Sequence, residues 1–227
     1  GGFVYDLDCC ERESLREYFS QIENGRFHVR EPWRIWNRDF HFFSNRILYK
    51  FTDAHALVED LIAMVPLTPI CLFRHPIPQV LSCIRRNWQP RMGGFFEQDA
   101  LLNQFFDQAQ CAFIKKTSKE GSVFQRHLLT WFVENAPILK TAISGKTFFI
   151  TYEHLVSDPF SELKLLCDTL NIKFRQQMLK QFDYPSRSSK YRRTKSKISN
   201  YIYEGDREKI IKSWQDDISD RQREEAE

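Results

Sequence analysis

Apolar positions along the chain fall into two spacings, short continuous runs and longer stretches with helical periodicity. The short runs at residues 46–51, 69–73 and 146–152 predict strands, and β-branched and aromatic residues make 146–152 the clearest, a strand buried on both faces. Helical periodicity predicts helices at residues 11–22, 54–64, 78–88, 99–118, 122–142, 159–170 and 206–220. Strands alternating with helices predict an α/β fold with a central parallel sheet, in a single domain over residues 1–227.

The second strand ends at a candidate anion site. Its apolar run, Ile70 to Phe73, stops at Arg74, and the following helix carries Ser82. Open α/β sheets bind ligands at the carboxyl ends of their strands. A guanidinium gives two parallel charge-assisted hydrogen bonds and a hydroxyl gives a third, which suits a phosphate. The alternative is a salt-bridged arginine at a strand end, with Ser82 as a small helix residue.

Composition narrows the classes of partner. A net charge of +3 gives no strong overall field for nucleic acid, although residues 187–197 hold six Lys or Arg and no acid. The six cysteines show no CxxC and no Cys/His ligand spacing, which favours a reduced, cytoplasmic protein. No apolar run approaches the roughly 20 residues that span a membrane, and no signal peptide is visible. A lumenal form whose anchor has been removed is the alternative location.

One phosphate-binding motif is rejected. Ser144-Gly145-Lys146-Thr147 resembles the end of a P-loop, but that motif needs a Gly separated by four residues from the Gly-Lys pair, where this chain has Lys140. The motif also needs a strand before the loop and a helix after it, which is the reverse of the order expected here. We therefore predict a turn leading into a strand.

Three segments in order resemble the sulfotransferase family that uses 3′-phosphoadenosine 5′-phosphosulfate (PAPS). FRHPIPQVLSCIRR resembles the family's 3′-phosphate motif, in which a strand-end Arg is followed eight residues later by a Ser. FFITYEHLVSDPFSELKLLCDTLNI, residues 148–172, is similar to the family's strand and "YEdLv.dP" segment, and RILYKFTDAHALVEDLIAMVP to its lysine-bearing strand and helix. Trp131 and Asn135 match a "W…N" helix. The order REPW, YKFTDA, FRHP is closest to tyrosylprotein-type and bacterial members.

The resemblance implies a three-layer α/β/α, P-loop NTPase-like fold and sulfuryl transfer from PAPS to a hydroxyl, leaving 3′,5′-adenosine bisphosphate (PAP), with no metal required. The family opens with a strand and a "P+SGTT"-type turn that wraps the 5′-phosphosulfate, and this sequence does not supply them. Because the rest of the donor motif is complete, we expect that segment to precede residue 1. The alternative is that the protein has lost half of its donor site.

The resemblance also assigns residues to the donor. Arg74 and Ser82 would hold the 3′-phosphate, Tyr152 would lie along the adenine, and Lys50 would stabilise the leaving phosphosulfate oxygen. A core tyrosine and a solvated lysine at a strand end are the structural alternatives for the last two. Residues 183–200 would form a basic loop that closes over the donor, with Arg187, Lys190, Arg192 and Arg193 as candidate ligands; a solvated basic loop is the alternative.

Three residues compete for the role of general base. Glu31, in REPW, stands where tyrosylprotein-type members carry a catalytic glutamate, and burial beside aromatic residues would raise its pKa toward that of a base. His55 is a rival, because cytosolic members use a histidine shortly after the lysine. They place it two residues on, where this chain has Thr52. His28 is a third option, and a surface acid is the alternative reading of Glu31.

Other functions stay open on the sequence. A non-catalytic sulfotransferase-like binding module and a kinase of the P-loop superfamily are the alternatives to the enzyme. Aromatic-rich segments at 27–43 and 88–106 favour an acceptor with apolar parts, either a hydroxylated small molecule, a glycan or a peptide tyrosine. We expect no nucleic-acid partner, and a homodimer is an option.

Overall fold

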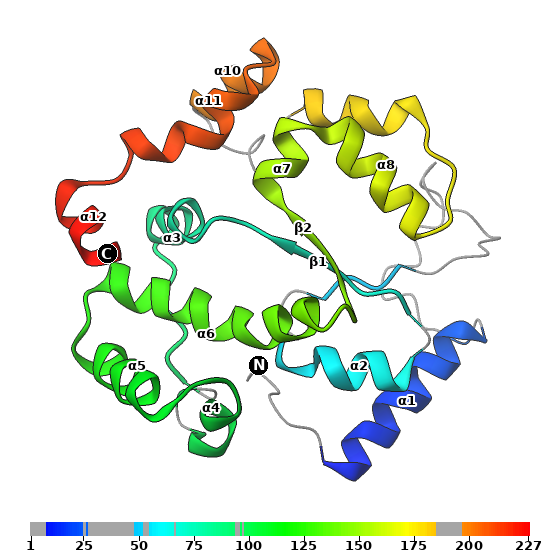
Figure 1. Cartoon of the computed structure of the whole chain (residues 1–227), viewed down its shortest axis with the longest axis horizontal. Coiled ribbons are helices and arrows are strands. Elements are labelled where there is room, and N and C mark those ends of the chain that lie inside the picture. The colour runs from blue at the N-terminus through cyan, green and yellow to red at the C-terminus, as the bar shows by residue number, and fades with distance from the viewer. Residues whose placement is uncertain are drawn as a thin grey trace. The chain divides into compact units, whose positions relative to one another are not determined.

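The computed structural model describes residues 8–24, 26, 48–51, 55–65, 67–93, 96, 98–184 and 197–227. It divides into two compact units, Gly1–Leu67 and Thr68–Glu227, which are described separately below. Figure 1 shows the elements of both units along the chain.

The first unit is a small helical cluster. Helix α1 spans Cys9–Glu23 and begins at a capping box, in which Asp8 accepts from the backbone N–H of Glu11 and the Glu11 carboxylate accepts from that of Asp8. A 3₁₀ turn, η2 (His55–Leu57), leads into α2 (Val58–Met64). Phe19 packs with Leu57, Leu61 and Val65 in an apolar core. The helices predicted at 11–22 and 54–64 are thus confirmed, the second with a 3₁₀ first turn.

The strand predicted at residues 46–51 is wrong over its described part. Residues 48–51 have no regular secondary structure. Tyr49 instead stacks edge-on against Phe19, with ring centroids 4.9 Å apart. An apolar run becomes a strand only where a partner strand accepts its backbone hydrogen bonds, and here the aromatic ring is buried against a helix.

The second unit contains a parallel pair of strands, as predicted. Strand β1 (Ile70–Phe73) pairs with β2 (Phe148–Thr151), and Phe73 lies opposite Thr151. Leu72 is 58 % exposed and Phe149 39 % exposed, so the described residues do not bury both faces. The described residues form no third strand, and the three-layer sheet stays a prediction.

Helices α3 (Pro76–Arg85) and α6 (Val123–Ile143) pack against each other beside this pair. Val80 and Leu81 of α3 form an apolar cluster with Phe124 of α6 and with Ile218 from the C-terminal segment. The turn at Ser144 and Gly145 leads into β2, which confirms that the SGKT sequence is not a P-loop.

The long helix predicted at 99–118 is wrong, because the structure has two helices there. Helix α4 (Asp99–Phe105) ends at Phe106, and α5 (Gln108–Glu120) begins at a capping box between Asp107 and Gln110. The Asp107 carboxylate accepts the backbone N–H of Gln110 at 2.8 Å, which stabilises a new helix start rather than a continuous helix.

The remainder of the chain is helical and more divided than predicted. After β2 come α7 (Tyr152–Ser157), α8 (Pro159–Thr169), the 3₁₀ segment η4 (Gln176–Asp183), α10 (Lys197–Glu204), α11 (Arg207–Lys212), η5 (Ser213–Asp216) and α12 (Asp220–Ala226). The single helix predicted at 206–220 is therefore three elements, since Ser219 caps a new helix with Gln222. The prediction of a loop at 183–200 is wrong at both ends, because Asp183 is the last residue of η4 and α10 begins at Lys197.

Two sequence predictions concern membrane-spanning segments and the state of the cysteines. None of the described helices is long and apolar enough to cross a membrane. All six cysteines carry free thiols. Burial raises the pKa of the Cys71 and Cys83 thiols, so neither is prepared to act as a thiolate nucleophile beside the strand end.

Candidate functional site

Arg74 and Tyr152 meet at the carboxyl ends of the two strands. Because β1 and β2 run parallel with Phe73 opposite Thr151, the residues that follow them leave the sheet side by side. The guanidinium carbon of Arg74 lies 4.7 Å from the centroid of the Tyr152 ring. A cation above an aromatic face is attracted by the ring's electron density, which holds the guanidinium in one place.

The Arg74 side chain fits an anionic ligand. It is half-buried, and its Nε is buried with no hydrogen-bond partner in the described part of the chain. The ring of Tyr152 offers attraction to the cation but no acceptor for its N–H groups. A buried charged donor without an acceptor is costly, and a phosphate oxygen would satisfy it.

Ser82 lies on α3, half-buried, six residues after the helix begins. That separation is about 9 Å along the helix axis, which places Ser82 in the second turn. The first turn contains Pro76 and Pro78, which have no backbone N–H to offer a ligand. Side chains rather than the helix N-terminus must therefore supply most of the donors for an anion here.

His75 ties this strand end to two other segments. Its backbone N–H donates to Oε1 of Glu153 at 3.0 Å, and its ring stacks on Trp214, with centroids 5.0 Å apart and planes 19° apart. Sequence reasoning missed both contacts. Glu153 could have been found from the parallel register, which places it beside His75 once Tyr152 is beside Arg74. Trp214 carries no sequence signal that points to His75.

The profile of the sulfotransferase domain family matches residues 77–227, which is more than half of the chain. The chain belongs to the sulfotransferase family. No curated protein and no solved structure matches it. The matched range begins three residues after Arg74, so it includes every residue expected to bind the donor except Arg74.

The other sulfotransferase site residues expected from the sequence belong to the first unit or lie outside the described residues. Lys50 is exposed in an irregular segment of the first unit, so its expected place at the end of a strand is wrong. His55 is the first residue of η2 in the same unit, on a helical turn as expected. The structure does not place either residue relative to Arg74. Glu31 and His28 lie outside the described residues.

The basic segment expected to close over the donor also lies largely outside the described residues. Arg187, Lys190, Arg192 and Arg193 all fall in the part of this segment that the structure does not describe. The described flanks are Tyr184, which is 61 % exposed, and α10.

The "W…N" helix is confirmed as α6, and its asparagine acts within the helix. Nδ2 of Asn135 donates to the backbone oxygen of Trp131 at 2.6 Å, and both residues are half-buried. This contact is local to one helical turn, so the structure supports a structural role for the pair.

A cavity of about 290 Å³ lies between the start of α8, η4 and α11. It is lined by Asp158, Pro159, Phe160, Gln176, Leu179, Lys180, Asp183 and Arg207. Hydrogen bonds from Ser161 lower the pKa of Asp158, which keeps this carboxylate charged. Two acids and two bases balance in the cavity lining, so it selects neither anions nor cations by net charge.

Proposed function

We propose that this sulfotransferase moves a sulfuryl group from PAPS to a hydroxyl of an acceptor molecule. The observation that carries the proposal is Arg74, whose buried Nε has no acceptor among the described residues while its guanidinium lies over Tyr152. A 3′-phosphate is the group that distinguishes PAPS from ATP. A fixed arginine fork at a strand end is suited to that phosphate, and Ser82 on α3 would add a hydroxyl donor.

The side chains then have separate tasks. Arg74 and Ser82 would hold the 3′-phosphate, and Tyr152 would orient both the guanidinium and the nucleotide. Lys50 would stabilise charge on the leaving oxygen, and the basic residues at 187–193 would close over the donor. The donor would supply the sulfuryl group, whose bond to the phosphate oxygen breaks as the acceptor oxygen bonds to sulfur. Positioning and charge stabilisation supply most of the catalysis in such in-line displacements.

The acceptor proton needs a base, and we propose Glu31. His55 and His28 are its rivals. An ionised carboxylate can take the proton from the acceptor hydroxyl as the new S–O bond forms, so charge does not build on that oxygen. The acceptor that fits the aromatic-rich segments at 27–43 and 88–106 is a hydroxylated molecule with apolar parts: a small molecule, a glycan or a peptide tyrosine.

Equilibrium binding of two nucleotides tests the donor assignment. Isothermal titration calorimetry compares PAP with 5′-AMP, which lacks only the 3′-phosphate. We expect PAP to bind at least about tenfold more tightly, since hydrogen bonds to charged groups contribute about 1.5–3 kcal/mol. Equal affinities would contradict a 3′-phosphate site. Tight PAP binding without label transfer from radiolabelled PAPS to phenolic, sugar or peptide acceptors would favour the non-catalytic binding module.

A further inference from the structure

The segment that follows α11 holds the strand end that carries Arg74. We call residues 213–226 the C-terminal clamp; it comprises η5, the turn after it and α12. Its first contact is the stack of Trp214 on His75, the residue directly after Arg74. Because His75 also donates its backbone N–H to Glu153, it is fixed on one side by the residue after Tyr152 and on the other by the clamp.

A second contact holds the other end of α3. Nη1 of Arg85, the last residue of α3, lies 2.6 Å from Oδ2 of Asp217 in the clamp. Ile218 follows directly and is buried in the cluster formed with Val80 and Leu81. The clamp therefore contacts α3 at both ends and along its apolar face, and Ser82 lies between these contacts.

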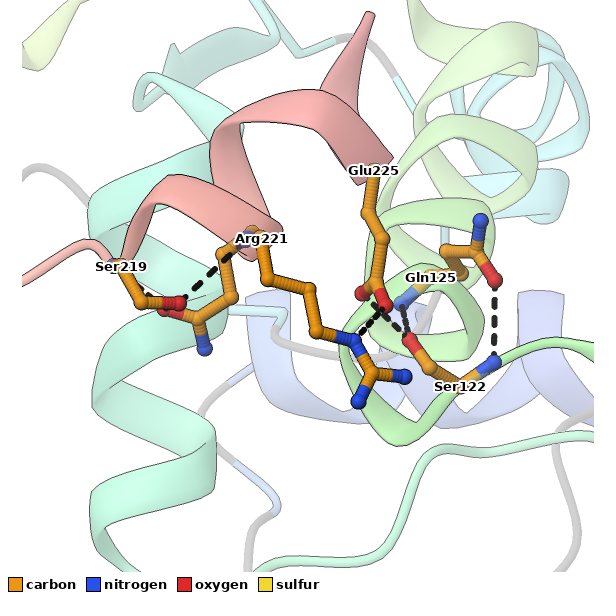
Figure 2. Close-up of polar contacts among 6 residues, drawn as sticks. Ser122, Gln125, Ser219, Arg221 and Glu225 are labelled. Carbon is orange, nitrogen blue, oxygen red and sulfur yellow. Dashed lines mark hydrogen bonds and ion pairs between the residues drawn. The ribbon is translucent and has the colours of Figure 1, made fainter.

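The clamp is itself anchored to the start of α6. Figure 2 shows Oγ of Ser122, the N-cap of α6, donating to Glu225 of α12 at 2.6 Å, while Arg221 Nε approaches the other oxygen of the same carboxylate at 2.9 Å. Ser122 Oγ also accepts the backbone N–H of Gln125. One hydroxyl thus caps α6 and also binds α12, so the C-terminal end of the clamp is attached to α6.

The backbone makes this arrangement sensitive at Arg74. Pro76 excludes the helical conformation at His75, which has φ −47° and ψ 131°, so the peptide between Arg74 and α3 has little freedom. A ring that moves at His75 therefore moves the backbone next to Arg74. The cation–π contact with Tyr152 holds only the guanidinium end of the Arg74 side chain. The clamp, through His75, restrains the backbone from which that side chain extends.

We propose that Trp214 is a positioning residue for the 3′-phosphate site, acting through His75 on Arg74. The inference rests on the proposed function, because it assigns Trp214 to the same phosphate. Trp214 would not touch the nucleotide. Its effect is on the placement of Arg74 and of α3 with Ser82, so it alters recognition of the 3′-phosphate and leaves the rest of the nucleotide site unchanged.

The ratio of the dissociation constants for 5′-AMP and PAP reports this role. We expect Trp214→Ala to lower the ratio about tenfold through weaker PAP binding, the order of effect that small displacements of a positioned group produce. Trp214→Phe keeps an aromatic ring for the stack and should restore most of the ratio. Phe113→Ala removes an exposed aromatic ring from α5 of the same unit and should leave the ratio at its wild-type value.

A second variant covers the case in which Trp214→Ala does not fold. His75→Ala removes the other ring of the stack from an exposed position, so the apolar cluster around Ile218 stays intact. It should lower the ratio by the same order, and the double variant with Trp214→Phe should lower it no further.

The outcomes separate the two proposals. If the wild type binds PAP and 5′-AMP equally, the proposed function fails and the role of Trp214 fails with it. If the wild type discriminates, Arg74→Ala abolishes the discrimination, and both Trp214→Ala and His75→Ala retain it, the positioning role alone is overturned. A fall in thermal stability of Trp214→Ala with an unchanged ratio would also overturn it, because that is the result of a purely structural residue.

Discussion

The guanidinium of Arg74 lies over the ring of Tyr152, 4.7 Å from its centroid, at the carboxyl ends of two parallel strands. The two residues are 78 positions apart in the chain and are brought together by the register of β1 and β2. This pair fixes a cation at a strand end, and no described residue supplies an acceptor for the buried Nε of Arg74. The guanidinium is therefore already oriented before an anion binds to it.

Two substitutions at Tyr152 distinguish the contribution of its aromatic ring to PAP binding from that of its hydroxyl. Tyr152→Phe keeps the aromatic face under Arg74, so we expect PAP affinity to change by less than about twofold. Tyr152→Ala removes the face, and the loss of a cation–π contact of about 0.5–2 kcal/mol should weaken PAP binding by about 2- to 30-fold. Calorimetric titration measures both. A larger loss in Tyr152→Phe than in Tyr152→Ala would contradict the cation–π contact.

Glu31 as the base gives a kinetic prediction. Glu31→Gln should reduce label transfer from radiolabelled PAPS by about 10²- to 10⁴-fold, the range typical of a lost general base, while PAP affinity stays at the wild-type value. His55→Gln and His28→Gln are the matched controls and should retain transfer. Near-normal transfer by Glu31→Gln, with loss in either histidine variant, would move the role to that histidine.

The turn between α5 and α6 has no room for a side chain. A Cβ on Gly121 would lie 2.5 Å from the backbone oxygen of Thr117 and 2.9 Å from its Cγ2. The backbone at Gly121 is ordinary, with φ −67° and ψ 154°, so the cost is steric. We expect Gly121→Ala to destabilise the fold by about 1–3 kcal/mol in urea unfolding. Gly93→Ala, where the added Cβ meets nothing within 4 Å, should leave stability unchanged.

The attachment of α12 should weaken in acid. The hydrogen bond from Ser122, together with pairing to Arg221, lowers the pKa of Glu225 from its ordinary value of 4.5. A carboxylate with a depressed folded pKa stabilises the fold above its unfolded pKa, and this stabilisation is lost as pH falls through the folded pKa.

Melting temperatures between pH 3 and pH 7 test this attachment. Glu225→Gln should lower Tm by up to about 4 °C above pH 5, as expected for an ion pair with an exposed arginine in a chain of this size, and the difference should vanish near pH 3. Glu224→Gln, on the exposed side of the same helix, should follow the wild type throughout. A difference that persists at pH 3 would show that the charge on Glu225 is not its source.

The elements around Arg74 could be predicted because their signals are local. An apolar run ending at Arg74, prolines in the next turn and helical periodicity around Ser82 define β1 and α3 without tertiary information. The aromatic run at 148–151 defines β2 in the same way, and the parallel pairing follows from the helices between the strands.

Other features depend on contacts that periodicity does not encode. The RILYKF segment has strand-like composition, but Tyr49 packs on Phe19 and no strand forms over residues 48–51. The break before α5 depends on one capping box, which outweighs the helical propensity on both sides of it. The stack of His75 on Trp214 joins residues far apart in sequence, and neither residue alone predicts it.

The most direct test of the 3′-phosphate site compares two arginine variants in the binding of PAP and 5′-AMP. Arg74 and Arg86 each lie over an aromatic ring, Arg86 at 5.1 Å from that of Trp88, so they are matched in charge and in the kind of contact, whereas Arg86 is exposed. We expect Arg74→Ala to bring the ratio of the two dissociation constants to about one, and Arg86→Ala to keep the wild-type preference for PAP. A preference for PAP that survives Arg74→Ala would contradict the account.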